Sequence, residues 1–430
     1  MADSVITKRL ILEQSEANQI LKVLLPKLKS IKETKKPPLK ITVMPDFFVD
    51  RIIEVVDYPK FVSDTRKKIL AGGGSMRGYT SIDIKGGNAV NVAYCLAKLG
   101  VNIDLYTIAD KIGTSILQSV FDAFGTMVNL HIKKGKHGLT TVFEFLDSES
   151  YSSSNVMISD VGDNDNFGPD LVESDNLSLT LESADAIIIT NWASNMRGTD
   201  LLKSIFTNSP NSIHFLDPAD IEKRCFEFIN TLRTNANLIH YLSINENEFN
   251  QLVEAIQSLN GGKTGYKNNQ NYKQNDHKSD NDHISTIINT NTTTKNSINE
   301  IYDIVQQLCI FEADSYPTNI SKVCKSVKAL SNYFNLNVCL HTTKGCVMSS
   351  SSVEGKDRDV VFVTSIVPSR IDIVSGAGDS WNAGFMFGHL HGFKDEEKLC
   401  FANLLASLHV ENVFNDDPSL SEVIDHIQSI

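Results

Sequence analysis

The sequence predicts an α/β fold in which a mostly parallel central sheet is flanked by helices and carries a small β-rich lid. Short apolar runs alternate with segments of helical periodicity along most of the chain, and such alternation is typical of parallel sheets covered on both faces. Two stretches, about 50–84 and 136–160, instead contain strand-like runs separated by turns. Because 41% of the 430 residues are hydrophobic, one large core can form.

The first strand of the predicted sheet follows a breaker cluster. Lys35-Lys36-Pro37-Pro38 interrupts the chain, and the apolar run Ile41–Met44 comes directly after it. Before the cluster, the sequence has amphipathic helical periodicity. We therefore expect residues 1–38 to form a helical extension and residues 39–430 to form the main domain.

The later elements alternate in type, with the two lid stretches as exceptions. Along the chain we predict a helix at 88–99, a strand at 101–108, a helix at 114–124, strands within 139–158, a strand at 185–190, a helix at 198–206, a strand at 212–216, a helix at 222–233, a strand at 238–244, a helix at 246–258, a strand at 337–341 and a helix at 380–391. Residues 261–298 are rich in Asn, Lys, Thr and Asp without apolar periodicity, which predicts a disordered insertion.

Charge and composition exclude several classes of protein. The net charge of -12 gives no basic field for a nucleic-acid backbone or an anionic membrane. No apolar run approaches the roughly 18 residues that span a bilayer. The lysine-containing N-terminal segment looks like a mitochondrial presequence, but Asp3, Glu13 and Glu16 oppose that interpretation. Seven widely spaced cysteines without a CxxC pair indicate reduced thiols in a cytoplasmic protein.

A glycine-rich turn, Gly376-Ala377-Gly378-Asp379, precedes a predicted helix. Phosphoryl transfer needs hydrogen-bond donors around a developing negative charge and a group that accepts a proton from the attacking hydroxyl. The glycines allow a sharp turn, and the helix N-terminus directs N–H groups to the same point. Gly376, Ala377 and Gly378 are therefore a candidate anion hole, and Asp379 is a candidate general base. A structural turn with Asp as the helix cap fits the same residues.

Two long motifs resemble those of the ribokinase-like (PfkB-type) carbohydrate kinases. The sequence IVSGAGDSWNAG, from Ile373 to Gly384, resembles the C-terminal signature of that family. The sequence GGNAVNVA, from Gly86 to Ala93, resembles its N-terminal glycine-rich motif. The resemblance covers residues 39 to about 415, apart from the predicted insertion. It implies a ribokinase-like fold and ATP-dependent phosphorylation of a hydroxyl group on a small sugar or sugar-like substrate.

The resemblance implies a set of substrate-binding residues. Asp50 matches the aspartate that hydrogen-bonds substrate hydroxyls, and Gly86, Gly87, Asn88 and Asn91 match residues that line the same pocket. Carboxylate and amide groups pair well with the hydroxyls of a polyol, and glycines permit its close approach. The alternatives are an exposed strand end for Asp50 and a helix-surface amide for Asn91.

The resemblance also implies a nucleotide side of the site. Asn245 and Glu248 match an Asn-x-x-Glu element near magnesium and the phosphates, and oxygen ligands with bridging water suit Mg²⁺. A helix cap with an acidic first turn fits the same spacing. Thr342 and Gly345 match a segment near the ATP phosphates and ribose, and Asn403 matches a residue that lines the adenine pocket.

Three positions depart from the family pattern. Pro45 and Thr342 stand where glycines are usual, and Ile373 stands where an acidic residue often precedes the turn. The last departure weakens the case for a monovalent-cation site, although Asp372 is adjacent. The segment Asp217–Asp220 does resemble a family landmark beside the nucleotide.

Three functions compete at this point. A sugar kinase is the leading hypothesis. A nucleoside kinase needs an apolar shelf for a base, which Phe47, Phe48 or Tyr79 would provide. A catalytically inactive sugar-binding protein would keep the fold without the reaction. For any of the three, an exposed edge of the lid strands would allow a homodimer.

Overall fold

The computed structural model describes most of the chain outside the predicted insertion. It covers residues 9–34, 38–147, 152–172, 177–259, 308–310, 320–351, 358–371, 374–412 and 416–430. The predicted insertion at 261–298 lies outside the described residues. Asp372 and Ile373, which bear on a monovalent-cation site, also lie outside them.

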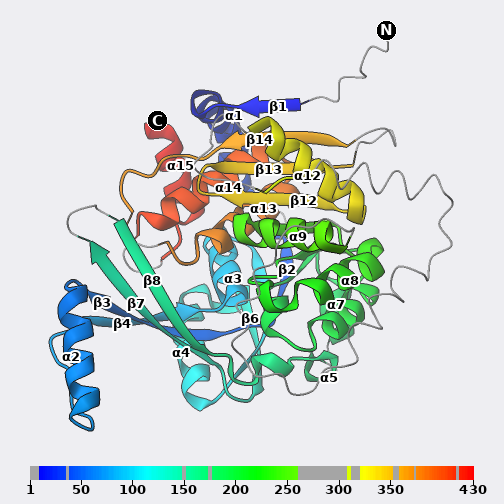
Figure 1. Cartoon of the computed structure of the whole chain (residues 1–430). Coiled ribbons are helices and arrows are strands. Elements are labelled where there is room, and N and C mark those ends of the chain that lie inside the picture. Colours follow the sequence, from blue (N-terminus) through cyan, green and yellow to red (C-terminus); the bar gives the residue numbers. More distant parts are fainter. Residues whose placement is uncertain are drawn as a thin grey trace.

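A ten-stranded sheet forms the centre of the molecule (Figure 1). Its order is β1-β14-β13-β12-β11-β10-β9-β2-β5-β6, and only β13 runs antiparallel to its neighbours among the described strands. In that order the strands are Arg9–Leu12, Asp359–Thr364, Gly345–Ser350, Asn337–Thr342, Tyr241–Asn245, Ile213–Leu216, Ala186–Ile189, Lys40–Met44, Asn102–Ala109 and Val128–Lys134. The predicted mostly parallel sheet is confirmed.

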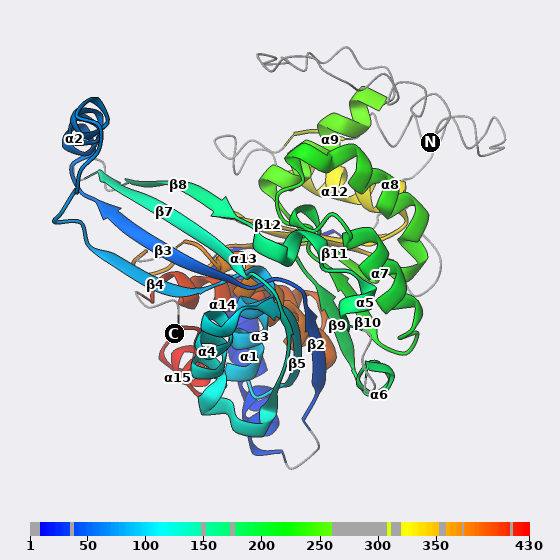
Figure 2. The same cartoon turned by 90° about the horizontal axis from the view of Figure 1, so that it is seen from below.

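Helices cover both faces of this sheet, so that apolar side chains form one core layer on each face (Figures 1 and 2). One layer includes α1 (Gln14–Glu33), α3 (Asn88–Lys98), α4 (Lys111–Phe121), α13 (Ala377–Leu390), α14 (Asp395–Val410) and α15 (Leu420–Ser429). The other includes α5 (Pro169–Val172), α6 (Leu177–Glu182), α7 (Gly198–Thr207), α8 (Cys225–Asn235), α9 (Glu246–Leu259) and α12 (Ile320–Phe334).

A second, four-stranded sheet projects from the body in both views (Figures 1 and 2). Its order is β4-β3-β7-β8, in which β3 and β7 are parallel and the outer pairs are antiparallel. The four strands are Ser81–Gly86, Phe48–Val55, Gly138–Asp147 and Ser152–Asp160. They occupy the two stretches in which strand-like runs were predicted.

The prediction that only turns connect the first of these stretches was wrong. A helix, α2 (Tyr58–Leu70), lies between β3 and β4 at the far end of the small sheet (Figure 2). Asp57 caps it by accepting a hydrogen bond from Lys60 N at 2.8 Å. None of its residues is buried, and Ile69 and Leu70 are exposed. Of its large apolar side chains only Phe61 is half buried, against Phe143 and Phe145 of β7, so the helix adds little to the core.

The N-terminal segment contributes to the core of the fold. The predicted helix is present as α1, and its Leu21, Leu24 and Leu28 side chains are buried. The preceding strand β1 pairs in parallel with β14, with Ile11 opposite Phe362. We predicted the helix but not the strand, because four residues are too few for a periodic signal.

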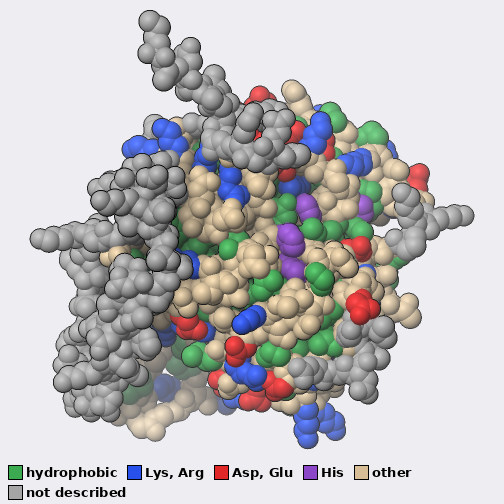
Figure 3. Space-filling model, turned by 90° about the vertical axis from the view of Figure 1, so that its right-hand side faces the viewer, with side chains coloured by type: hydrophobic (Ala, Val, Ile, Leu, Met, Phe, Trp, Pro, Cys, Tyr) green, Lys and Arg blue, Asp and Glu red, His purple; other side chains and the backbone are tan. Residues whose placement is uncertain are grey.

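The described surface carries both signs of charge. On the face in Figure 3, basic and acidic side chains are interspersed over the described residues. No helix in the described ranges combines the length and apolarity needed to cross a membrane.

Candidate active site

Polar residues gather where the parallel strands of the large sheet end. Asp46 follows β2, Thr190 and Asn191 follow β9, and Asp217 follows β10. These strands are neighbours and parallel, so their carboxyl ends meet at one edge. Strand β2 lies between β5 and β9. The chain adds β5 and β6 on one side of β2 and later adds β9, β10 and β11 on the other, so the direction of the strand order reverses at β2. Ligands in open α/β sheets bind at the carboxyl edge beside such a reversal.

Asp46 fixes the start of α3 at this edge. Its buried carboxylate accepts hydrogen bonds from Asn88 N at 2.8 Å and Ala89 N at 3.0 Å. Thr190 Oγ1 and Asn191 Nδ2 donate to the same carboxylate at 2.8 and 3.1 Å. Asp46 therefore anchors the helix that carries Asn91. We did not single it out from the sequence, although it directly follows the first strand, as functional residues of such sheets often do.

Gly86 and Gly87 lead from the small sheet into α3. A Cβ atom on Gly86 would collide with the Asp50 carboxylate, and one on Gly87 would lie 2.8 Å from Asp46 O. Gly87 also has a φ of 90°, which favours glycine. Asp50 thus lies against the glycine pair. Burial raises the pKa of the Asp50 carboxyl to about 6, although a hydrogen bond from Thr140 opposes the shift.

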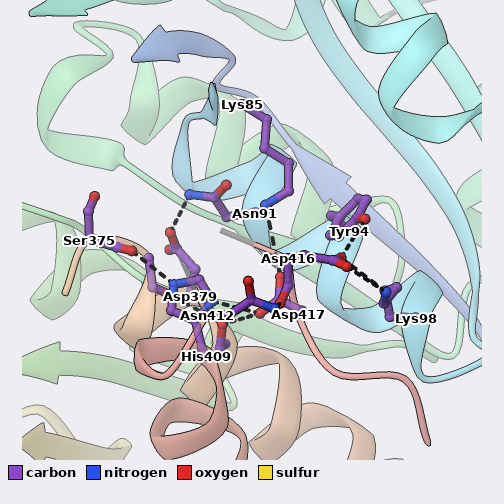
Figure 4. Close-up of polar contacts among 12 residues, drawn as sticks. Lys85, Asn91, Tyr94, Lys98, Ser375, Asp379, His409, Asn412, Asp416 and Asp417 are labelled. Carbon is purple, nitrogen blue, oxygen red and sulfur yellow. Dashed lines mark hydrogen bonds and ion pairs between the residues drawn. The ribbon is translucent and has the colours of Figure 1, made fainter. Parts of the chain in front are cut away.

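Asp379 lies buried in the first turn of α13 and contacts α3. The turn begins at Gly376, whose φ of 88° is left-handed. Asn91 Nδ2 donates to Asp379 Oδ2 at 2.9 Å (Figure 4). Asn91 Oδ1 is buried and has no hydrogen-bond partner among the described residues. The two predicted motifs therefore meet in one site, where the amide holds the carboxylate and keeps one acceptor unused.

The electrostatics of the site favour a proton on Asp379. Burial raises the pKa of its carboxyl well above the ordinary value, and the nearby Asp217 carboxylate raises it further. The hydrogen bond from Asn91 opposes this shift. Burial also raises the pKa of Asp217 to about 6, against hydrogen bonds from Ala219 N and Asn382 Nδ2. A carboxylate in these surroundings is a stronger base than an exposed one.

The helix N-terminus leaves backbone donors beside this base. Ala377 N donates to Val374 O at 3.3 Å. The N–H groups of Gly378 and Asp379 precede the first bond within the helix, which Ser380 N makes. The N–H groups of Gly378 and Asp379 are thus better placed to receive an anion than that of Ala377.

Asn245 and Glu248 form a reciprocal cap at the start of α9. Asn245 N and Nδ2 donate to the buried Glu248 carboxylate at 2.9 and 2.7 Å, and Glu248 N donates to Asn245 Oδ1 at 3.0 Å. Burial, and then the charges of Asp217 and Asp220, raise the pKa of Glu248 well above its ordinary value. The cap that we weighed as the alternative is therefore present.

Three acidic side chains gather near the start of α9. No group of three or more His, Cys, Asp or Glu side chains in the described ranges is arranged to hold a metal. Asp217, Asp220 and Glu248 nevertheless lie close enough for their charges to interact. Such a set would suit a hydrated Mg²⁺, which these residues would hold through water.

The predicted nucleotide residues use their polar side-chain atoms within the protein. Thr342 Oγ1 donates to Gly345 O at 3.0 Å in the β12–β13 turn. Asn403 Oδ1 accepts from Trp381 Nε1 at 2.9 Å, and Asn403 Nδ2 donates to Thr364 O at 3.1 Å. Their contacts to ATP stay a prediction.

His341, in the segment matched to the nucleotide side together with Thr342 and Gly345, is a neighbour of the turn that the sequence did not single out. Its ring stacks on Trp381 with centroids 5.1 Å apart, and a Cβ on Gly378 would lie 3.1 Å from His341 Cε1. Burial lowers the pKa of His341 to about 4, so the ring is neutral at pH 7. Only its position at the end of β12 connects it with the site.

The aromatic shelf that we predicted for a nucleoside base is already packed. Phe47 and Phe48 are buried, and the Phe47 ring stacks on His137 with centroids 5.3 Å apart. Tyr79 contacts Phe61 of α2 at 5.5 Å between centroids. These residues give no preference for a nucleoside.

Comparisons with known proteins identify the fold. No protein-family model matches the sequence, and no curated protein matches it. Adenosine kinase from Sinorhizobium meliloti superposes with a TM-score of 0.58 at 16% identity, over 92% of this chain and 99% of that one. Ribokinase from Arabidopsis thaliana, in complex with ribose and ATP, gives 0.57 at 17% identity, over 91% and 99%. Burkholderia thailandensis nucleoside kinase, in complex with inosine, gives 0.53 at 13% identity, over 91% and 98%. The chain therefore has the fold of ribokinase and adenosine kinase.

Proposed function

We propose that this protein is a kinase that transfers the γ-phosphoryl group of ATP to a hydroxyl of a small sugar or sugar-like substrate. The observation that carries the proposal is the buried Asp379, which lies at the N-terminus of α13 and accepts a hydrogen bond from Asn91. A base beside a helix N-terminus is the arrangement that phosphoryl transfer to a hydroxyl requires. The shared fold of ribokinase and adenosine kinase supports this class of reaction.

The acceptor hydroxyl is the group that Asp379 deprotonates. The raised pKa of Asp379 strengthens it as a base toward an alcohol. Asp50 and the unused Asn91 Oδ1 would accept hydrogen bonds from other hydroxyls of the substrate and so orient the reacting one. The freed oxygen then attacks the γ-phosphorus, and ADP leaves.

The transferred group would meet the backbone N–H groups of Gly378 and Asp379, which stabilise its charge as it passes between oxygens. Magnesium, when bound with ATP, supplies charge neutralisation at the phosphates. Asn245 and Glu248, with Asp217 beside them, would hold its water ligands. Thr342, Gly345 and Asn403 border the proposed nucleotide side.

The small sheet would act as a lid. It joins the site through Asp50 on β3 and Gly86 on β4. Closure over the substrate would exclude water and favour transfer to the acceptor over hydrolysis of ATP.

We also propose that two such lids pair in a homodimer, because Val156, Met157 and Ile158 are exposed on the edge strand β8. Sedimentation velocity tests this proposal. Ile158→Glu should give a monomer if the wild type is a dimer, and a monomeric wild type contradicts the proposal.

A coupled ADP-release assay tests the function. Wild-type protein, ATP and Mg²⁺ are combined with pentoses, hexoses, sugar phosphates and nucleosides in turn, with Asp379→Asn as the control for contaminating kinases. Acceptor-dependent ADP release by the wild type is expected with a sugar. Turnover with nucleosides alone would favour the nucleoside kinase. Calorimetric sugar binding without ADP formation would favour an inactive binding protein and overturn the proposal.

A further inference from the structure

A buried cluster of charged side chains contacts the residues on either side of the turn that carries Asp379 (Figure 4). Asp417 is at its centre and is 1% exposed. His409 Nδ1 lies 2.9 Å from Asp417 Oδ1, and Ser380 Oγ donates to the same oxygen at 2.5 Å. Lys85 Nζ faces Asp417 Oδ2 at 3.9 Å. Helices α14 and α13 and strand β4 thus converge on one carboxylate.

The second nitrogen of His409 holds the turn itself. His409 Nε2 lies 2.9 Å from the backbone oxygen of Ser375, the residue before Gly376. The carbonyl oxygen can only accept a hydrogen bond, and so can an ionised Asp417. Both ring nitrogens of His409 must therefore carry a proton when Asp417 is ionised, and the ring is then an imidazolium cation.

Asp417 is suited to remain ionised. Burial alone would raise the pKa of its carboxyl, but the hydrogen bond and charge of His409, the charge of Lys85 and the hydrogen bond from Ser380 hold that pKa below the ordinary value. The negative charge in turn stabilises the imidazolium. A buried ion pair with hydrogen bonds on both partners keeps a fixed geometry.

We propose that His409 is a positioning residue of the phosphoryl-transfer site: its ring, fixed by Asp417, anchors the Ser375 carbonyl and so holds the turn Gly376–Asp379 in its working geometry. The inference rests on the proposed function. Gly376 makes the turn easy to deform, and small displacements of donors in such sites are costly.

Other charged groups around the cluster define its surroundings. Asp379 lies on α13, and Tyr94, Cys95 and Lys98 come from α3. Asp416 accepts from Tyr94 Oη at 2.7 Å and pairs with Lys98 at 3.0 Å. Lys85 connects the cluster to the small sheet, because it is adjacent to Gly86 on β4. The cluster therefore joins the proposed lid to the turn.

Substitution of His409 tests the role in catalysis. In His409→Gln an amide can still donate to Ser375 O, but the charge is lost. We expect kcat to fall by about 10- to 100-fold, with KM for the acceptor unchanged within about twofold, because His409 touches no substrate. The matched control is His391→Gln at the other end of α13, where the ring bonds to Phe387 O; it should keep wild-type kcat. An unchanged kcat in His409→Gln overturns the proposal.

Substitution of Asp417 tests whether the carboxylate fixes the ring of His409. In Asp417→Asn the ring loses the carboxylate that orients it, so its contact to Ser375 O is weakened. We expect kcat to fall by about 10- to 100-fold, as in His409→Gln, with KM for the acceptor unchanged within about twofold. A wild-type kcat, or a change in KM alone, contradicts the proposal.

A spectroscopic measurement separates this inference from the proposed function. In wild-type protein labelled with ¹⁵N-histidine, and with His409→Gln used for assignment, both His409 nitrogens should show the protonated signature at pH 7, because each faces a hydrogen-bond acceptor. A neutral ring at pH 7 overturns the inference even if the protein is an active kinase. A protonated ring in a protein that forms no ADP with any acceptor would refute the proposed function and leave the buried imidazolium standing.

Discussion

Asn91 Nδ2 donates a hydrogen bond to Asp379 Oδ2 at 2.9 Å, across 288 residues of sequence. The bond joins the first turns of two helices, α3 and α13, whose N-termini meet at the carboxyl edge of the large sheet. It also fixes the carboxylate of the proposed base, while Asn91 Oδ1 stays without a partner among the described residues. One amide therefore links the two glycine-rich motifs and leaves an acceptor beside the proposed base.

Asp379→Asn should lower kcat by about 10² to 10⁴-fold, because an amide cannot take the proton of the acceptor hydroxyl. KM should change far less, since Asn keeps the size of Asp and can still accept from Asn91. Steady-state ADP release at saturating ATP measures both constants. Turnover close to the wild type would exclude Asp379 as the base.

The same substitution should stabilise the fold at alkaline pH. Burial raises the pKa of Asp379 in the folded protein above its unfolded value of 3.8, so the folded state binds the proton more tightly. The associated stability is present below the unfolded value and is lost as pH rises through the folded value. Asp379→Asn escapes this loss. We expect a gain of about 1 kcal/mol at pH 8, seen as a Tm higher by about 2 °C and absent at pH 4. An equal or lower Tm at pH 8 would contradict the burial argument.

After burial, the charge of Asp217 should contribute most to the position of the acid limb of the reaction. Asp217 raises the pKa of Asp379, because two carboxylates close together disfavour a second negative charge. Asp217→Asn removes that charge, so the pKa of Asp379 falls and the acid limb of kcat/KM should move to lower pH. A limb that stays in place or moves to higher pH would show that Asp379 titrates without this coupling. Glu227→Gln, on the exposed side of α8, is the matched control.

Gly86 and Asp50 should act as one unit. A methyl group on Gly86 would collide with the Asp50 carboxylate and displace it. Gly86→Ala and Asp50→Asn should therefore each raise KM for the acceptor by about tenfold, equivalent to about 1.4 kcal/mol. In the double variant the two effects should be clearly less than additive. Full additivity would show that Gly86 acts on something other than Asp50.

Much of the fold could be predicted because its signals are local. The alternation of buried strands with amphipathic helices gave the parallel sheet, and buried elements such as β11 and α9 have strong apolar patterns. Helix α2 escaped prediction although Phe61, Val62, Ile69 and Leu70 have helical spacing, and the structure buries none of its side chains fully. Strand β1 escaped because it is short and pairs with β14, about 350 residues away.

Some residues of the candidate site could also be predicted from the sequence, and others could not. Asp379 and Asn91 lie within motifs that the sequence displays, and the structure brings them into contact. His409, Asp417 and Lys85 have no such motif, because their relation depends on the three-dimensional packing of α14, β4 and the segment after α14. Asn403 was predicted from the sequence as a nucleotide-binding residue, but in the structure its side-chain amide is hydrogen-bonded to Trp381 and to Thr364 of β14.

The N-terminal helix should behave as part of the main core. Leu24 of α1 is 1% exposed and packs in the layer that contains α14 and α15, whereas the adjacent Val23 is 73% exposed. Leu24→Ala should lower the free energy of unfolding by about 2–5 kcal/mol through lost burial and a cavity. Val23→Ala, the matched control, should change it by less than about 0.5 kcal/mol. Urea unfolding followed by tryptophan fluorescence measures both, because Trp381 and Trp192 lie in the domain after residue 39. If α1 were an independent extension, Leu24→Ala would leave the unfolding midpoint of these tryptophans unchanged.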